Sequence, residues 1–437
     1  MAGTYFPRWR PLQGAGNESG RVVGIEERLP WPQTAAMGLQ HVVAMFGSTV
    51  LAPLLMGFDP NLAILMSGIG TLIFFLFVGG RVPSYLGSSF SFIGLVIAVT
   101  GYAGQGPNGN IGVALGGIIA CGVAYALIGA VVMAIGTRWI EVLMPPVVTG
   151  AIVAVIGLNL APIAVKGVSG NSFDTWMALL TVLCVGMVAV FSRGMVQRLL
   201  ILVGLMLAYA IYAVLANGAG MGKPIDFLPV AQAAWFGVPH FTAPVFTHEA
   251  MAMLAPVAII LVAENLGHIK AVGAMTGQNL DRYIGRAFLG DGVATVVSGS
   301  VGGTGVTTYA ENIGVMAVTK IYSSLIFVTA AVIAVLLGFS PKFGALIQTI
   351  PAAVLGGASI VVFGLIAVAG ARIWVENRVD FSDNRNLIVV AVTLVLGAGD
   401  FTLKLGQFSL GGIGTATFGA ILLHALLSMR QGRAAKA

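Results

Sequence analysis

Glu264 and His268 stand four residues apart within an apolar stretch of the sequence. On a helix this spacing places the carboxylate and the imidazole on one face, where they can share a proton. Such a pair can also form half of a metal site, but no second Glu/His pair or cysteine cluster completes one, so we expect no metal. A purely structural hydrogen-bonded pair is the other alternative.

Three further ionisable residues lie inside apolar segments: His41 near the start of the chain, and Asp291 and Glu311 in its second half. An ionisable side chain at bilayer depth costs about 3 kcal/mol unless it is paired or faces water. Residues of this kind are therefore candidates for function, and the alternative is a polar contact that joins two helices. We take Glu264, His268, Asp291 and His41 as candidates for proton coupling.

Glu311 follows a short stretch rich in glycine and threonine, residues 302–308. An extended stretch ahead of a half-helix presents backbone N–H groups and a positive dipole end to a ligand. The first half of the chain has a similar break at Ser89-Phe90, where the Phe90 ring is able to stack on a flat ligand. If residues 302–305 formed only a tight turn, the carboxylate of Glu311 would have no assigned role.

The residue types at these breaks favour a neutral heterocycle that carries N–H donors beside C=O acceptors. Carboxylates accept hydrogen bonds from N–H groups, backbone amides donate to carbonyls, and an aromatic face covers the ring. Uracil has this edge pattern. We therefore expect uracil as the substrate and a proton carried with it on Glu264 or Asp291, with His268 as a relay.

The composition places these residues in a membrane. Of the 437 residues, 57% are apolar and only 9% are charged, which is too few to cover a water-soluble surface. The 60 glycines and 18 prolines are typical of closely packed and interrupted membrane helices. Runs of about 20 residues are long enough to cross a hydrocarbon core of about 30 Å. We predict fourteen segments, near residues 33–55, 60–79, 85–99, 110–133, 141–162, 173–192, 197–216, 250–270, 284–299, 304–318, 320–339, 348–370, 386–399 and 408–429.

The net charge of +6 does not indicate nucleic-acid binding, because the basic residues are scattered singly between apolar segments. Loops on the cytoplasmic side of a membrane hold most Lys and Arg residues. With the N-terminus inside and fourteen crossings, all but four of the 22 basic residues lie inside; the four are Lys166, Lys223, Lys342 and Lys404. We therefore expect a multi-pass protein of the bacterial inner membrane, surrounded by lipid, with both termini in the cytoplasm.

Seven crossings in each half place the second half upside down relative to the first. The fifth and twelfth segments favour a duplication, since residues 144–150 (MPPVVTG) resemble residues 350–356 (IPAAVLG). Segments three and ten are both short and broken by small residues, and such a pair at matching positions points to a binding site at the membrane midplane. The predicted fold class is an all-α membrane protein with two inverted seven-segment repeats.

Residues 311–320 resemble the signature of the nucleobase/ascorbate transporter family. That signature is Gln or Glu, then Asn-x-Gly-x-x-x-x-Thr followed by Arg or Lys, and the chain matches it with Glu311, Asn312, Gly314, Thr319 and Lys320. The pair Gln40-His41, residues 85–90 and residues 263–268 are also similar to the family pattern. The resemblance extends from about residue 27 to residue 429.

The resemblance implies a core domain of residues 33–135 and 245–340 and a gate domain of residues 136–220 and 341–430, after a cytoplasmic N-terminal segment of residues 1–32. It also implies short β-strands in segments three and ten. Members of the family commonly form homodimers through the gate domain, while the core domain moves like an elevator. The resemblance therefore implies the same assembly and motion for this chain.

For the site, the resemblance implies that Glu264 and Glu311 hold the base directly and that His268 assists. It also implies that the backbones of Phe90 and Ala310 hydrogen-bond to the base. Glu in place of Gln at position 311 fits the branch of the family that accepts pyrimidines. No cofactor is implied.

Other functions are open beside uracil–proton symport. The first is transport of thymine, of xanthine or other purines, or of nucleobases in general. Anion exchange is a weaker alternative, because two buried carboxylates repel an anion unless they are protonated. An intramembrane enzyme would need a catalytic motif, and the sequence contains no His-Glu-x-x-His, Gly-x-Ser-x-Gly or Asp-rich metal motif. We therefore expect a transporter and not an enzyme.

Overall fold

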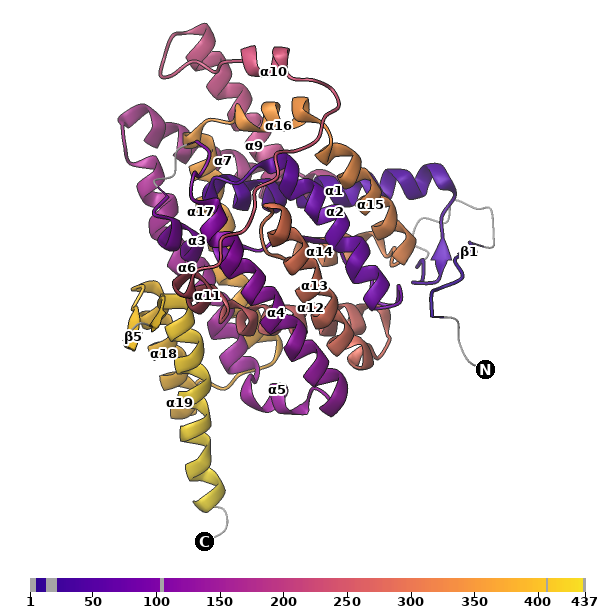
Figure 1. Ribbon diagram of the computed structural model, residues 1–437, viewed down its shortest axis with the longest axis vertical. Helices are drawn as coiled ribbons and strands as arrows, with labels where there is room; N and C mark the ends of the chain where they lie inside the picture. The colour runs from indigo at the N-terminus through magenta and orange to yellow at the C-terminus, as the bar shows by residue number, and fades with distance from the viewer. Residues whose placement is uncertain (1–4, 13–21, 103–105, 406–407, 435–437) are drawn as a thin grey trace.

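The computed structural model describes residues 5–12, 22–102, 106–405 and 408–434, and within these ranges the chain is built mainly of helices (Figure 1). Eight helical spans there are long and apolar enough to cross a membrane, which defines a multi-pass membrane protein as expected. A ninth is formed if α15 (Ser324–Gly338) and α16 (Pro341–Gln348), bent by 81°, count as one. The eight are α1 (Trp31–Met56), α2 (Pro60–Phe77), α4 (Ile111–Ile135), α6 (Pro146–Val168), α7 (Ser172–Phe191), α9 (Leu200–Ala213) with the π-turn η2 (Val214–Gly218), α11 (His248–Leu254) with α12 (Val257–Thr276), and α17 (Ala352–Glu376).

Shorter elements complete the described ranges. Two of the helices carry ionisable residues in their apolar surroundings: α13 (Ile284–Val301) holds Asp291 and α14 (Ala310–Thr319) holds Glu311. The other helices are η1 (Phe90–Phe92), α3 (Ile93–Thr100), α5 (Arg138–Leu143), α8 (Met195–Arg198), α10 (Leu228–Gln232), η3 (Asp281–Tyr283), α18 (Asn384–Ala398) and α19 (Gly412–Ala434). The strands are β1 (Arg10–Pro11), β2 (Glu27–Arg28), β3 (Leu86–Ser88), β4 (Val306–Thr308), β5 (Leu403–Leu405) and β6 (Phe408–Leu410).

The predicted segments correspond to helices, to pairs of consecutive helices or to a strand followed by helical turns, with shifted boundaries. The segment predicted at 141–162 divides into α5 and α6 because Pro145 and Pro146 interrupt it, and the one at 250–270 divides into α11 and α12 next to Pro256. The predicted count of fourteen crossings goes beyond the eight or nine spans that length and composition identify in the described residues.

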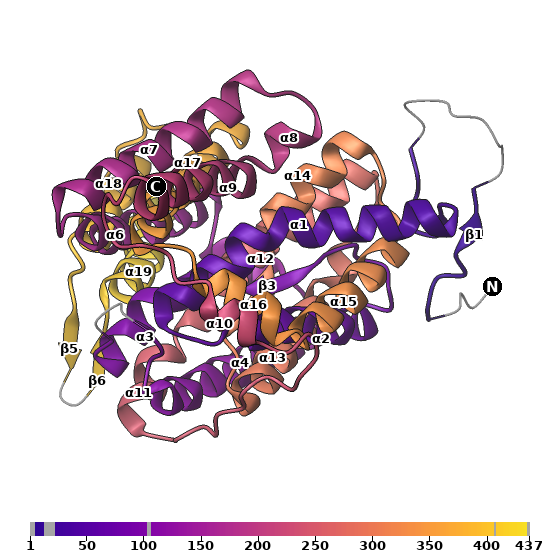
Figure 2. The same ribbon diagram turned by 90° about the horizontal axis from the view of Figure 1, so that it is seen from above.

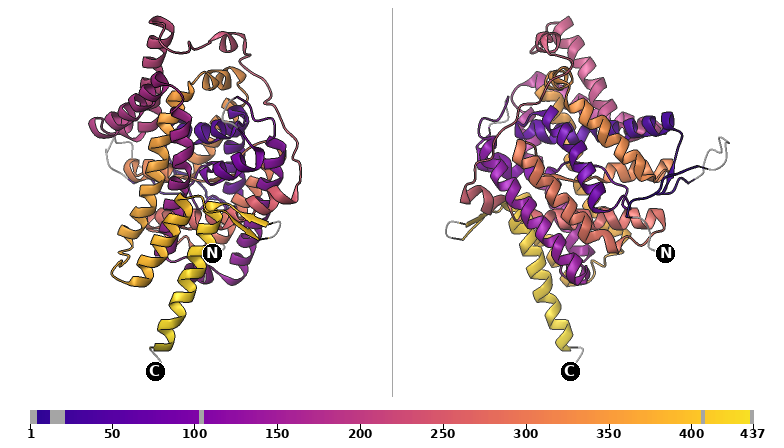
Figure 3. Two further views of the ribbon diagram at one scale, coloured as in Figure 1. Left: turned by 90° about the vertical axis from the view of Figure 1, so that its left-hand side faces the viewer. Right: turned by 45° about the vertical axis from the view of Figure 1, so that its right-hand side comes forward.

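The helices form two groups that lie side by side when the molecule is viewed from above (Figure 2). In the first group, α15 packs against α1 and α2, and α13 packs against α2 and α4. In the second group, α17 packs against α6, α7 and α9, and α18 packs against α6 and α19. Figure 3 shows the C-terminal end of α19 projecting beyond the other helices. Each group therefore combines helices from both halves of the chain.

Glycines let helices within each group approach closely. A Cβ atom at Gly292 of α13 would lie 2.4 Å from the backbone nitrogen of Ala126 in α4. A Cβ atom at Gly370 of α17 would lie 2.4 Å from the backbone nitrogen of Ala154 in α6. Because backbone atoms cannot give way as a flexible side chain can, both helix pairs require glycine at these positions.

We expect Gly292→Ala to destabilise the protein by about 1–3 kcal/mol, as overpacking of a rigid interior does. The measurement is the apparent melting temperature of the purified protein in detergent. Gly186→Ala in α7 is the matched control, since an added Cβ there meets nothing within 4 Å. If the two variants melted at the same temperature, the close contact between α4 and α13 would not be required for stability.

Two short strands, one from each half of the chain, pair antiparallel inside the first group. Leu86 of β3 lies opposite Thr308 of β4, and Ser88 lies opposite Val306. The hydroxyl of Thr304 donates to the Ser88 hydroxyl oxygen at 2.6 Å. The strands expected in segments three and ten are therefore present, and their pairing bonds backbone groups that have no water available at membrane depth.

The N-terminal segment is attached to the first helix group. The backbone N–H of Val23 donates to the carbonyl of Lys320 at 2.9 Å, and the N–H of Tyr322 donates to the carbonyl of Val23 at 2.8 Å. An ion pair joins Glu26 to Arg81, which follows α2. The segment therefore connects the end of α2 with the residues that follow α14.

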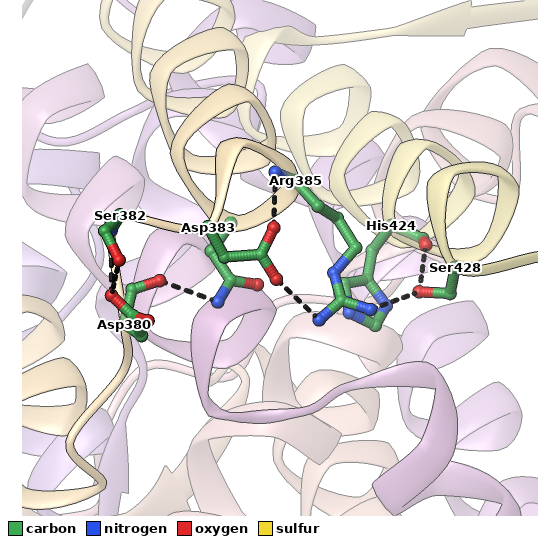
Figure 4. A network of polar contacts seen from close by, with 7 residues as sticks. Asp380, Ser382, Asp383, Arg385, His424 and Ser428 are labelled. Carbon is green, nitrogen blue, oxygen red and sulfur yellow. Dashed lines mark hydrogen bonds and ion pairs between the residues drawn. The ribbon is translucent and has the colours of Figure 1, made fainter. Parts of the chain in front are cut away.

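A polar network connects the loop after α17 with α18 and α19 (Figure 4). Asp383 caps α18 by accepting a hydrogen bond from the backbone N–H of Arg385 at 2.9 Å, and its other oxygen lies 3.0 Å from the guanidinium of Arg385. Arg385 also donates to the hydroxyl of Ser428 in α19 at 3.4 Å. Hydrogen bonds from the hydroxyl and backbone N–H of Ser382 hold the pKa of Asp380 below its usual range. The network fixes the start of α18 against α19.

Candidate functional site

The predicted binding residues lie around the paired strands β3 and β4. Glu264 and His268 are one helical turn apart on α12 and half-buried. Glu311 is in the first turn of α14, close enough to Glu264 for their charges to interact. Ala310 begins α14 and is exposed, whereas Phe90 begins η1 and is buried.

The carboxylate of Glu264 has an oxygen available for a ligand. Its Oε2 atom is buried and has no hydrogen-bond partner among the described residues. A buried polar atom without a partner costs about 1–3 kcal/mol, and more if it is charged. An N–H group of a bound molecule would remove this cost.

Glu311 is held from two sides. The hydroxyl of Ser48 in α1 donates to Oε1 of Glu311 at 2.9 Å. The first turn of α14 places the carboxylate at the positive end of that helix. These contacts orient Glu311 at the point where β4 passes into α14.

His41 is engaged beside Glu311 and not with Glu264. Its Nδ1 atom is 2.9 Å from Oδ1 of Asn312, the residue after Glu311, and its ring centroid lies 4.6 Å from that of Phe327 in α15. His41 is fully buried. It therefore joins α1 to α14 and α15 behind the candidate site.

Asp291 is linked to His268 through two uncharged side chains. Nδ1 of His268 is 2.9 Å from the hydroxyl oxygen of Thr308, and that hydroxyl donates to Oδ1 of Asn265 at 3.0 Å. Nδ2 of Asn265 donates to Oδ2 of Asp291 and, at 2.8 Å, to the hydroxyl of Tyr125 in α4. Two of the predicted proton-coupling residues therefore belong to one hydrogen-bonded chain.

The remaining signature residues lie away from the carboxylates. Lys320 ends α14 with a positive φ of 54° and is exposed, and the hydroxyl of Thr319 donates to the carbonyl of Val315 at 2.9 Å. Gly314 is half-buried on α14. The structure therefore brings Glu311 and Asn312 of the signature to the site and places Thr319 and Lys320 at the far end of the helix.

Sequence reasoning missed Ser48, Thr308 and Tyr125, and it gave Asn265 no role. Uncharged polar residues are common inside membrane proteins, where they join helices, so their types alone carry no specific signal. Thr308 lies at the break before Glu311, which was the one available indication. Within the described ranges, no group of three or more His, Cys, Asp or Glu side chains is arranged to hold a metal.

Apolar membrane spans that surround ionisable side chains beside two interrupted segments define a membrane transporter. A family model described as the permease family matches residues 32–406. The chain belongs to this family of nucleobase/ascorbate transporters, which confirms the resemblance of residues 311–320.

The relatives at this level of similarity are permeases and not enzymes. A provisionally named pyrimidine permease of Escherichia coli (strain K12), RutG, is 72% identical over 98% of this chain and 97% of its own length. A uracil permease of Paenibacillus larvae is 42% identical over 92% of this chain and 96% of its own length. The uracil permease of Escherichia coli (strain K12) is 37% identical over 94% of this chain and 95% of its own length.

Solved structures share the fold at low sequence identity. The transmembrane domain of the cyanobacterial bicarbonate transporter BicA superposes with a TM-score of 0.66 at 16% identity, covering 89% of this chain and 96% of that domain. The murine anion transporter Slc26a9 superposes with a TM-score of 0.64 at 11% identity, covering 92% of this chain and 69% of that protein. The chain therefore has the fold of these transporters.

Proposed function

We propose that this protein imports uracil and related pyrimidine bases across the bacterial inner membrane together with protons. The observation that carries the proposal is the buried Oε2 atom of Glu264, which has no hydrogen-bond partner in the described ranges, beside the second carboxylate of Glu311. The names of the relatives, pyrimidine permease and uracil permease, support the same substrate class.

The arrangement suits the edge of a pyrimidine. The carboxylates of Glu264 and Glu311 accept from ring N–H groups, and the backbone N–H groups at Phe90 and Ala310, where two helices begin, donate to the ring carbonyls. Phe90 lies at the contact between the helix groups, since its ring is 6.2 Å from that of Phe363 in α17. His268 completes the site on the side of Glu264.

Thymine and xanthine are the alternative substrates. Thymine presents the same N–H and C=O edge as uracil, and a purine presents a similar edge on a larger ring. The family signature has Gln or Glu at position 311, and the Glu in this chain supports a pyrimidine as the substrate. The bicarbonate and anion transporters share only the fold, and two carboxylates that lie close to each other repel an anion.

The contacts between helices support fourteen segments in two inverted repeats. In such a repeat, α2 corresponds to α13 and α4 corresponds to α15, so the contact of α4 with α13 and the contact of α15 with α2 are equivalent. The contacts of β3 with β4 and of α6 with α17 relate corresponding elements directly. Both α6 and α17 begin directly after a proline, Pro145 and Pro351.

In the proposed mechanism the first helix group is the core domain and the second is the gate domain. The core carries the bound base past the gate like an elevator, and two copies associate through their gate domains. Exposed apolar side chains on α7, among them Trp176, Val190 and Phe191, are available to lipid or to a second copy. In Figure 1, α5 and the C-terminal end of α19 lie at the end opposite α10 and α16, which supports a cytoplasmic position for Arg138 at the start of α5 and for the end of α19.

Uptake of radiolabelled uracil in cells that lack other uracil permeases tests this function. Uptake is expected to fall to the level of cells without the protein when a protonophore is added, because the pH gradient then disappears. Unlabelled uracil and thymine are expected to compete more strongly than xanthine. Uptake that persists with the protonophore would refute proton coupling, and stronger competition by xanthine would favour the purine alternative.

A further inference from the structure

A chain of hydrogen-bonded side chains leads from Asp291 to His268, and its inner members are closed to water. Asn265, Asp291 and Tyr125 are completely buried, and Thr308 is 1% exposed. They come from α12, α13, α4 and β4, which pack against one another. Because water cannot replace a missing partner here, the donors and acceptors of the chain must match one another.

The donor and acceptor roles along this chain are fixed when Asp291 is ionised. A carboxylate only accepts, so the Asn265 amide must direct its Nδ2 atom to Asp291 and its Oδ1 atom to Thr308. The single hydroxyl proton of Thr308 is then donated to Asn265. Nδ1 of His268 must therefore carry a proton and donate it to Thr308.

Protonation of Asp291 removes this requirement, because a carboxyl group also donates. Its O–H group is then able to donate to Oδ1 of Asn265 with the amide turned over, while Nδ2 of Asn265 donates to Thr308. In that arrangement the hydroxyl of Thr308 donates to Nδ1 of His268, and the neutral imidazole carries its proton on Nε2.

We infer that an ionised Asp291 holds a proton on Nδ1 of His268 and that protonation of Asp291 opens the alternative with the proton on Nε2, through rotation of the Asn265 amide and the Thr308 hydroxyl. Asp291 takes up one proton. A neutral ring of His268 gives its Nδ1 proton to water and takes one from water at Nε2, since the ring is only half-buried, and its charge does not change; a doubly protonated ring gives its Nδ1 proton to water and becomes neutral. Thr308 and Asn265 are positioning residues, because they act on the site through His268.

Few other ionisable groups face this chain. Next to α13, the helix α4 brings Tyr125 and Cys121, whereas α2 and β4 bring none. On α12, Glu264 is near enough to Asp291 for their charges to interact. Lys270, at the outer part of α12, is 2.6 Å from Glu141. The test must therefore distinguish the titration of Asp291 from that of Glu264.

This inference deepens the proposed function and rests on it. With Asp291 ionised and the ring neutral, Nε2 of His268 has a lone pair and accepts from an N–H group of the base. With Asp291 protonated, Nε2 is able to carry the proton of the neutral ring and to donate to a carbonyl of the base. Proton uptake at a group outside the binding site thus changes the hydrogen-bonding preference of His268.

The test reads both groups in one sample without uracil. The full chain, labelled with 15N-histidine and 13C-aspartate, is reconstituted in lipid bilayers and examined by solid-state NMR at several pH values. The protein has five histidines, so the imidazole signals of His268 are assigned by their loss in His268→Gln. The carboxyl signal of Asp291 is assigned by its loss in Asp291→Asn.

Only certain pairs of states agree with the inference. An ionised Asp291 is expected with a proton on Nδ1, in a neutral or a doubly protonated imidazole. A neutral imidazole protonated on Nε2 is expected only with a protonated Asp291. An ionised carboxyl with a neutral Nε2–H ring would overturn the inference, and so would the absence of any Nε2–H ring once Asp291 is protonated.

Substitutions of Thr308 separate coupling from folding. Thr308→Ser keeps the hydroxyl and is expected to preserve the pairing of states, whereas the nearly isosteric Thr308→Val removes the hydroxyl and is expected to abolish the pairing. Pairing that survives in Thr308→Val, or is lost in a folded Thr308→Ser, would overturn the inference. Because no substrate is present, failed uracil uptake with intact pairing would refute only the proposed function.

Discussion

Glu264→Gln and Glu311→Gln are each expected to weaken uracil binding about 10- to 100-fold. Hydrogen bonds to charged groups contribute about 1.5–3 kcal/mol, and 1.4 kcal/mol corresponds to a factor of ten in Kd. Gln keeps the size of Glu but turns one acceptor into an N–H donor, which faces the N–H group of the base. The measurement is Kd for radiolabelled uracil with the purified protein in detergent.

The control is Glu249→Gln, the same substitution on the exposed surface of α11. It is expected to leave Kd unchanged. Melting temperatures of the variants show whether they are folded. If Glu264→Gln and Glu311→Gln both bound uracil with the affinity of the unsubstituted protein, the two carboxylates would not be the binding groups.

A disulfide between the two helix groups is expected to stop transport completely. A Cβ atom at Gly47 of α1 would lie 3.3 Å from Cβ of Ile201 in α9, near the separation of about 3.5–4.5 Å found in disulfides. Oxidation of the double variant Gly47→Cys, Ile201→Cys joins the proposed core and gate domains. Elevator motion is then blocked, and a reductant is expected to restore uracil uptake.

A disulfide within the gate domain provides the matched control. A Cβ atom at Gly356 of α17 would lie 3.6 Å from Cβ of Val168 in α6, and both helices belong to the second group. Uptake by Gly356→Cys, Val168→Cys is expected to be equal before and after oxidation. Normal uptake by the oxidised Gly47/Ile201 variant would mean that the two groups do not move past each other.

The long spans were predictable because burying about 20 apolar residues in lipid leaves the helix as the available structure. The short elements were not predictable from the sequence pattern. β3 and β4 have three residues each, too few for a periodic pattern, and they were expected only from the family resemblance. The attachment of Val23 to Lys320 joins residues far apart in the sequence, and neither residue type indicates it.

The candidate site also contains residues that the sequence indicates and residues that it does not. Glu264, His268, Asp291 and Glu311 were predicted because an ionisable side chain inside an apolar segment is costly and therefore conspicuous. The residue that supports Glu311, Ser48, is an ordinary polar residue of a membrane helix. Contacts of this kind depend on how the helices pack, which the sequence does not show directly.

The pairing of β3 with β4 also constrains how the chain is made. Ser88 and Tyr309, which are joined by a hydrogen bond, are separated by 221 residues. At about 5–20 residues per second, the ribosome needs roughly 10–45 seconds to synthesise that length. During this interval the peptide groups of residues 86–88 have to be satisfied by water or by the insertion machinery. Segment three therefore cannot complete its final backbone pairing before β4 has been synthesised.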